Sequence, residues 1–168
     1  MIMHTTVKFA KVRPTAKIPT KRVEDAGYDI YADFEEDYIL IPPHDTVMIP
    51  TGIASACDTD FCLILKERGS TGTKGMAQRC GVIDSGYRNE IFVPITNTTN
   101  QRIYIIKKGK EDDYPMLRGH NTFYPYEKAI SQILVIPVPT VDVEEYTYEE
   151  LLAIPSSRGT GALGSSGK

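Results

Sequence analysis

The chain has 168 residues, of which 41% are hydrophobic and 24% charged, with 13 glycines, 11 prolines and no tryptophan. This length suits one compact domain rather than several. The 19 basic and 22 acidic residues give a formal net charge of -3, which argues against a broad electrostatic surface for a nucleic-acid polymer or an acidic lipid. No apolar run approaches the roughly 20 residues that span a bilayer, and the N-terminal sequence lacks a signal peptide's apolar core, so we expect a soluble, cytoplasmic protein.

Short β-strands punctuated by proline and glycine dominate the predicted elements. In chain order, strands are expected at residues 6–12, 28–33, 38–41, 46–49, 61–67, 91–96, 102–106, 130–138 and 141–143. Helical periodicity is nearly absent, apart from a short piece after Gly69 and the stretch 144–153, in which Tyr148, Leu151 and Leu152 would share one face. The pattern therefore predicts an all-β sandwich or barrel.

Two segments depart from this pattern. Residues 97–126 are polar and charged except for one strand-like run, and they are expected to leave the core, most simply as a solvated hairpin. Residues 156–168 contain four serines and four glycines, too little apolar surface to fix themselves. We therefore expect one domain over residues 1–155, with an insert at about 97–126, followed by a flexible arm over 156–168.

The cysteines and histidines give no sign of a metal site. The three cysteines are odd in number and lack C-x-x-C spacing, so we expect free thiols at Cys57, Cys62 and Cys80. The histidines lack the H-E-x-x-H spacing that brings two imidazoles onto one helical face.

The segment GVIDSGYRNEI, residues 81–91, contains the strongest candidate for chemistry. Asp84 follows two apolar residues and precedes Ser85-Gly86, a pair suited to the bend of a β-hairpin. An aspartate there either accepts backbone hydrogen bonds as a turn residue or serves as a general base, with Tyr87 as an aromatic wall beside it.

Two further segments are candidate phosphate-binding sites. In KERGSTGTKGM, residues 66–76, backbone N–H groups and Arg68 are suited to phosphate oxygens, although Lys74 is followed by glycine, unlike a P-loop. The glycine-rich arm begins with Arg158 and is suited to closing over a phosphorylated ligand. Taken singly, residues 66–76 are more simply an ordinary turn, and the arm is more simply a disordered tail.

Together and in order, five short motifs resemble those of the trimeric dUTP pyrophosphatases, or dUTPases. The motifs are AGYDIYA at 26–32, RGS at 68–70, GVIDSGYR at 81–88, AISQ at 129–132 and RGTGALGSSG at 158–167. The resemblance implies a homotrimer of jelly-roll-like β-barrels in which all three chains build each active site. It also implies Mg²⁺-dependent hydrolysis of dUTP to dUMP and pyrophosphate, which limits uracil in DNA and supplies dUMP.

The resemblance assigns a task to each matching residue. Asp84 would deprotonate a water that attacks the α-phosphorus. The 81–91 hairpin, through Gly81 and Ile83, would read the uracil edge with its backbone, while Tyr87 would pack against deoxyribose and exclude a 2′-hydroxyl. Asp29 would meet Mg²⁺ through water. The remaining substrate-binding residues would be Arg68, Gly69, Ser70, Gln132 and Arg158, with Leu163, Gly164 and Ser165 in an arm that closes over the nucleotide.

Three positions depart from the family pattern. Gly69 stands where the second motif usually has serine, which removes a hydroxyl expected near the scissile phosphate. Leu163 stands where the fifth motif has phenylalanine, so an aliphatic contact replaces stacking on uracil and we expect weaker arm closure. The third departure, Ser85-Gly86, should affect the hairpin more than the chemistry.

The insert at 97–126 resembles those of dUTPases from staphylococcal phages, which would place the protein in the host-cell cytoplasm. In that group the enzyme also binds a repressor of mobile pathogenicity islands. The resemblance therefore implies a repressor partner, and deletion of residues 98–121 is expected to alter partner binding while leaving dUTP hydrolysis largely intact.

Alternative functions remain open from the sequence. An aspartic protease shares the apolar-Asp-Ser-Gly signature of residues 82–86, although it needs none of the other motifs. A dCTP deaminase would share the fold, but its hallmark catalytic residues have no counterpart here. The departures at Gly69 and Leu163 give some weight to a regulatory binding protein with impaired catalysis. A working enzyme is favoured over it, because the other motif residues are in place: Asp29, Arg68, Asp84, Tyr87, Gln132 and Arg158.

Overall fold

The structure is a computed structural model that describes residues 5–79, 81–117 and 119–161. The chain divides into a β unit that ends at Val138 and a second unit that begins at Pro139. The first unit contains strands β1 (Lys8–Lys11), β2 (Tyr28–Tyr31), β3 (Tyr38–Ile41), β4 (Thr46–Pro50), β5 (Ile53–Ala56), β6 (Phe61–Lys66), β7 (Met76–Gln78), β8 (Val82–Ile83), β9 (Phe92–Asn97), β10 (Ile103–Ile106), β11 (Thr122–Pro125) and β12 (Ala129–Pro137). It also contains helix α1 (Gly69–Gly72) and a 3₁₀ turn, η1 (Pro115–Leu117), while α2 (Tyr148–Ala153) belongs to the second unit.

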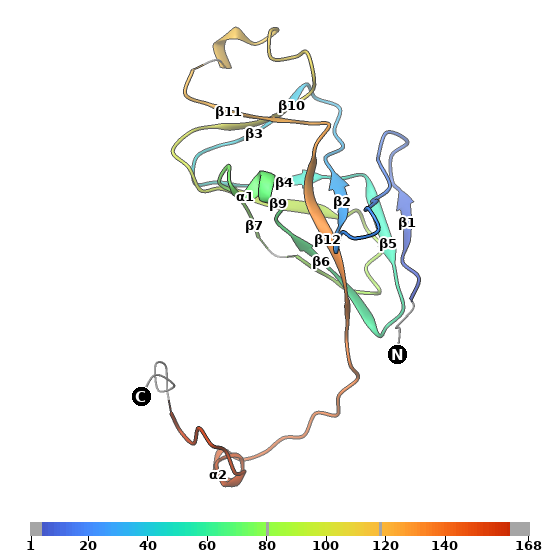
Figure 1. Ribbon diagram of the computed structural model, residues 1–168, viewed down its shortest axis with the longest axis vertical. Helices are drawn as coiled ribbons and strands as arrows, with labels where there is room; N and C mark the ends of the chain where they lie inside the picture. Colours follow the sequence, from blue (N-terminus) through green and yellow to red (C-terminus); the bar gives the residue numbers. More distant parts are fainter. Residues whose placement is uncertain (1–4, 80, 118, 162–168) are drawn as a thin grey trace. The chain divides into compact units, whose positions relative to one another are not determined.

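Four small sheets enclose the core of the β unit (Figure 1). The strand orders are β2-β12-β6-β8, β4-β9-β7, β11-β10-β3 and β1-β5. Branched aliphatic side chains suit such short, half-buried strands, and they form the cluster between the sheets. Its fully buried members include Ile30, Ile41, Ile49, Ile53, Leu63, Ile95, Ile103, Ile105, Tyr124 and Ile133. The architecture confirms the all-β, jelly-roll-like class.

Strand β12 sets the position of the motif residues. It pairs antiparallel with β2 on one side and β6 on the other. Gln132 lies opposite Asp29 of β2 and opposite Lys66 of β6, so the register brings the first, second and fourth motifs to the same place. Directly opposite residues of antiparallel strands lie on the same face of a sheet, within side-chain contact.

Most predicted strands are confirmed, but four short ones were missed. These are β5, β7, β8 and β11, of two to four residues each, whose compositions include small, polar or proline residues rather than a clear alternation. The predicted strand at 141–143 is wrong, because these residues pair with no described strand and a strand needs a partner for its backbone groups.

Both helical predictions are confirmed in part. The piece after Gly69 is α1. The second helix begins only at Tyr148, because Thr147 caps it: the Thr147 hydroxyl accepts from the Glu150 amide at 3.2 Å, and the Glu150 carboxylate accepts from the Thr147 amide at 2.8 Å. Tyr148, Leu151 and Leu152 are 67%, 56% and 50% exposed, so the face that they were expected to share is uncovered in the described residues.

The region of the predicted insert has a buried part. All four residues of β10 are buried, and β10 pairs with β3 and, in parallel, with β11. Parallel strands need a crossover connection, so the hairpin interpretation is wrong and the chain leaves the sheet only over residues 107–121 (Figure 1). Deleting residues 98–121 would remove β10 from the core, so that deletion cannot leave the rest of the molecule intact. Within the described ranges, no helix has the length and apolar character to cross a membrane.

Candidate active site

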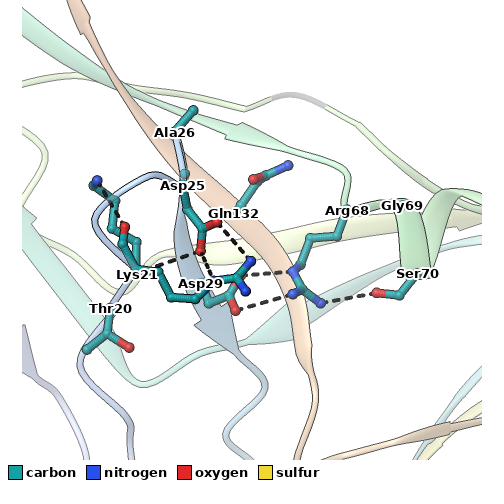
Figure 2. A pocket seen from close by; sticks show the side chains of 11 residues that line it. Thr20, Lys21, Asp25, Ala26, Asp29, Arg68, Gly69, Ser70 and Gln132 are labelled. Atoms are coloured by element: carbon teal, nitrogen blue, oxygen red, sulfur yellow. Dashed lines mark hydrogen bonds and ion pairs between the residues drawn. The ribbon is translucent and has the colours of Figure 1, made fainter.

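The first, second and fourth motifs line one polar cavity of about 760 Å³ (Figure 2). Strand β2 contributes Asp29, the chain just before and within α1 contributes Arg68, Gly69 and Ser70, and β12 contributes Gln132. The structure thus brings together five residues that the sequence analysis singled out, although Asp29 and Gln132 are more than a hundred residues apart in the chain.

Arg68 is the charged centre of this cavity. Its Nε lies 2.8 Å from Asp29 Oδ1 and its Nη2 lies 3.2 Å from Asp29 Oδ2, so the guanidinium and carboxylate form a bidentate pair. Nη1 donates to Ser70 Oγ at 3.1 Å (Figure 2). Ser70 Oγ in turn lies 3.3 Å from the Tyr124 hydroxyl. Arg68 is therefore held in place before any ligand binds. The side chains of Arg68 and Asp29 remain about one-third exposed.

Gln132 is fixed by the backbone on both sides. Its Nε2 donates to the Glu67 carbonyl at 2.8 Å. Across the sheet, Gly27 leaves room for it: a Cβ at residue 27 would lie 2.9 Å from Gln132 Cβ, closer than real Cβ atoms approach. The glycine of the first motif and the glutamine of the fourth are thus one packing unit.

The sequence reasoning missed a second ion pair on the rim of this cavity. Arg22 Nε lies 2.9 Å from Asp25 Oδ2, and its Nη2 donates to Asp25 Oδ1 at 3.0 Å. The hydrogen bond from Arg22 lowers the pKa of Asp25. Lys21 and Thr20 complete the rim. The only sequence signal for these residues is their position immediately before the first motif.

The third motif lines a different cavity, of about 340 Å³ and largely apolar. Gly81, Ile83 and Tyr87 contribute to it, with Met48 and Phe92 from β4 and β9. Asp84 follows β8 directly and its side chain is exposed, while its carbonyl accepts from the Tyr87 amide at 3.0 Å. The predicted turn is confirmed. The predicted hairpin is wrong, because β8 joins β6 while β9 joins β4 and β7.

No described residue lines both cavities, and Asp84 lines neither of them, so neither cavity brings Asp84 and Arg68 together. Of the fifth motif, Arg158 lies in the second unit, where its Nε donates to the Gly161 carbonyl at 3.0 Å. Leu163, Gly164 and Ser165 lie outside the described residues.

Donors for a divalent cation are few. Within residues 5–79, 81–117 and 119–161, no three His, Cys, Asp or Glu side chains gather as a metal-binding group. Mg²⁺ is nevertheless commonly held by one or two carboxylates together with substrate phosphates and several waters. Asp29 and Asp25, which both line the larger cavity, fit that arrangement and do not fit an all-protein cage.

Comparison with known proteins agrees with this geometry. Residues 14–110 match the dUTPase family model. A deoxyuridine 5'-triphosphate nucleotidohydrolase of Wolbachia pipientis is 32% identical over 149 residues, covering 87% of this chain and 83% of the relative. The dUTPase of Staphylococcus bacteriophage 80alpha with dUPNHPP superposes with a TM-score of 0.73 at 21% identity, over 97% of this chain and 99% of that one. The dUTPase of S. aureus phage phi11, which has a species-specific insert, gives a TM-score of 0.67 at 18% identity, over 84% and 96%. The chain belongs to the dUTPase family.

Proposed function

We propose that this protein is a dUTP diphosphatase that hydrolyses dUTP to dUMP and pyrophosphate, and so limits uracil in DNA while supplying dUMP. Family membership supports the reaction. The observation that carries the proposal is the meeting of Asp29, Arg68, Ser70 and Gln132 in one polar cavity large enough for a triphosphate. Because the Arg68 fork is already oriented by Asp29 and Ser70, phosphate oxygens would meet a preorganised donor group.

The triphosphate would occupy the larger cavity. Arg68, Ser70 and Gln132 would donate to phosphate oxygens, and the open space around Gly69 would leave room for the scissile phosphate. Arg158, with Leu163, Gly164 and Ser165 of the arm, would close over the nucleotide and exclude water. Mg²⁺, held by phosphate oxygens and through water by Asp29, would neutralise charge on the departing pyrophosphate.

The nucleoside would occupy the apolar cavity of the third motif. Backbone groups at Gly81 and Ile83 would read the uracil edge, and Tyr87 would pack against the deoxyribose. The Tyr87 hydroxyl donates to the Glu90 carbonyl at 2.9 Å, which fixes the ring that would exclude a 2′-hydroxyl. Asp84 is exposed at the start of the turn that follows β8. A carboxylate in this position is suited to accepting a proton from the attacking water.

A homotrimer with shared active sites would resolve the separation of the two cavities. If the Asp84 turn of one copy faced the Arg68 cavity of another, nucleoside and triphosphate would be bound by adjacent parts of one composite site. The apolar lining that β4 and β9 expose, including Met48 and Phe92, is consistent with a surface covered by a neighbouring copy.

The reaction is tested by pyrophosphate release from dUTP, dTTP, dCTP and UTP, with and without Mg²⁺. Release from dUTP in strong preference to the other three nucleotides, and only with Mg²⁺, is expected. Asp84→Asn keeps the size of the side chain but cannot take a proton, so it should abolish turnover while dUTP still binds. Turnover that survives this substitution would exclude Asp84 as the base, and ammonia release from dCTP would indicate a deaminase instead.

A second function, binding of a repressor protein, is favoured by the crossover at 107–121. None of its described residues, 107–117 and 119–121, lines either cavity. Two of its residues nevertheless contact the loop before β3: the Tyr114 hydroxyl donates to Asp37 Oδ2 at 2.9 Å, and Lys110 Nζ lies 3.3 Å from Asp37 Oδ1. Phage dUTPases of this fold control transfer of virulence genes, and that of phage phi11 has a species-specific insert. A surface separate from both cavities would allow partner binding without loss of dUTP hydrolysis.

A further inference from the structure

A partly buried ionic network includes Glu90, three residues beyond the turn from Asp84 to Tyr87. Arg13 Nη2 and Nη1 bond Glu90 Oε1 and Oε2 at 2.6 and 2.9 Å, and Arg13 Nε bonds Asp33 Oδ2 at 2.8 Å. The side chains of Asp33 and Glu90 are only 4% and 13% exposed. One guanidinium therefore neutralises two carboxylates that have little contact with water, an arrangement that is costly to break by removing one partner.

Glu90 also fixes the backbone that precedes β5. Its Oε1 accepts from the amides of Thr51 at 3.1 Å and Gly52 at 2.7 Å. Gly52 has a φ of +65°, and a Cβ there would collide with the Asp33 carboxylate and with Ala16. Burial opposes ionisation of Glu90, but the hydrogen bonds from Arg13, Gly52 and Thr51 outweigh it and lower its pKa. Glu90 is thus a charged, fully engaged acceptor.

The turn from Asp84 to Tyr87 is held by hydrogen bonds of two side chains, those of Arg88 and Tyr87. At one end, Arg88 Nη1 donates to the Ser85 carbonyl at 2.6 Å and to the Ser55 carbonyl of β5 at 3.2 Å. At the other end, the Tyr87 hydroxyl donates to the Glu90 carbonyl at 2.9 Å. The position of Tyr87 therefore depends on where the Glu90 backbone lies, and the Glu90 side chain fixes that backbone through Arg13.

The same network reaches the first motif. Asp33 follows β2, the strand that carries Asp29, and Arg13 Nη2 donates to the Asp33 carbonyl at 2.9 Å. The Asp33 amide donates to the Pro50 carbonyl at 2.8 Å. Arg13 consequently links Asp33, the residue after the first motif, to Glu90, two residues beyond the third, although it belongs to neither motif.

We propose that Arg13 and Glu90 are positioning residues for catalysis: by bridging the first and third motifs they fix the Asp84–Tyr87 turn, and with it the discrimination between deoxyribose and ribose. This inference rests on the proposed function, because Asp84 and Tyr87 act there on water and sugar. Displacement of a reacting group by about 1 Å can reduce the rate about a hundredfold. Loss of a network that positions the turn should therefore strongly reduce kcat.

The test is Glu90→Gln, with Arg13→Lys as a second variant that retains the positive charge. In Glu90→Gln the new amide N–H₂ would face either Arg13 or the Thr51 and Gly52 amides, donor against donor, so the anchor fails with little change in volume. For each variant, kcat and KM are measured on dUTP and on UTP at a temperature well below Tm. We expect kcat/KM for dUTP to fall by roughly 10- to 100-fold and the dUTP to UTP preference to fall as well.

A purely structural effect would give a different result. Partial unfolding lowers the concentration of active enzyme, which scales kcat equally for dUTP and UTP and leaves KM and the preference unchanged. Asp37→Asn is the matched control, because it removes an ion pair of the crossover that touches neither cavity, and it should leave both parameters unchanged. An unchanged dUTP to UTP preference in Glu90→Gln overturns the inference, whereas a wild-type protein inactive on dUTP overturns the proposed function itself.

Discussion

Single glycines define the larger cavity as much as its charged residues do. Gly27 and Gln132 pack so closely that a methyl group at residue 27 must displace the glutamine. Gly27→Ala should therefore raise KM for dUTP by several-fold or more, since Gln132 would lose its placement toward phosphate. Steady-state kinetics would check this, with Gly72→Ala as the control. Gly72 does not line the cavity, and a Cβ there would meet nothing within 4 Å. Equal kinetics for the two variants would contradict the packing argument.

Gly69 offers the opposite case, because a side chain there would meet nothing within 4 Å. The hydroxyl missing from the second motif can therefore be restored without a clash. A hydrogen bond to a charged group such as phosphate contributes about 1.5 kcal/mol or more, so Gly69→Ser should raise kcat/KM by about tenfold. Gly72→Ser in the same helix serves as the control. A fall in kcat/KM specific to Gly69→Ser would mean that the glycine is required for a close approach by the substrate.

At the level of elements, the crossover between β10 and β11 determines how the insert can be removed. The two strands are parallel, so a replacement linker must connect the end of β10 to the start of β11 at the other end of the sheet. For four-residue strands this distance is about 13 Å. We expect that substitution of residues 111–117 by a Gly/Ser linker of equal length abolishes repressor binding and leaves dUTP hydrolysis unchanged. Pyrophosphate release and a pull-down with the repressor would measure the two activities. Loss of both to the same extent would contradict a separate surface.

The sequence predicted those elements whose pattern is local. Strands such as β3 and β6 follow from runs of branched and aromatic residues, and the turn at Ser85-Gly86 follows from its residue types. The two-residue strand β8 and the parallel partner of β10 could not be predicted, because both depend on neighbours distant in the chain. The same reason explains the site: Arg68, Asp29 and Gln132 were found from their motifs, but Arg22 and Arg13 lie outside every motif.

For the whole molecule, the separation of the two cavities predicts that two inactive variants can complement each other within one assembly. Asp84→Asn and Arg68→Met should each be inactive as pure proteins. If each site combines the Asp84 turn of one copy with the Arg68 cavity of another, mixed trimers refolded from equal amounts should regain activity at roughly a quarter of the sites. Pyrophosphate release and the mass of the assembly would be measured together. Mixed assemblies without activity would mean that each chain supplies both residues to its own site.

The match of residues 14–110 to the dUTPase family model removes the protease alternative for Asp84, since that model spans the first three motifs. The contacts of Arg68 with Asp29 and Ser70 also weigh against a protein that has lost catalysis, because they hold its guanidinium in the phosphate cavity. A regulatory activity would then be an addition to the enzyme rather than a replacement for it.

The central position of β12 has a consequence for folding kinetics. Tyr28 in β2 pairs with Ile133 in β12, so the main sheet cannot close until two segments more than a hundred residues apart have met. Until then β2 and β6 each present an open edge to other chains in solution. Refolding from denaturant should consequently be slow, and its yield should fall as protein concentration rises, because intermolecular strand pairing competes with the arrival of β12. Light scattering during refolding at several concentrations would measure this competition.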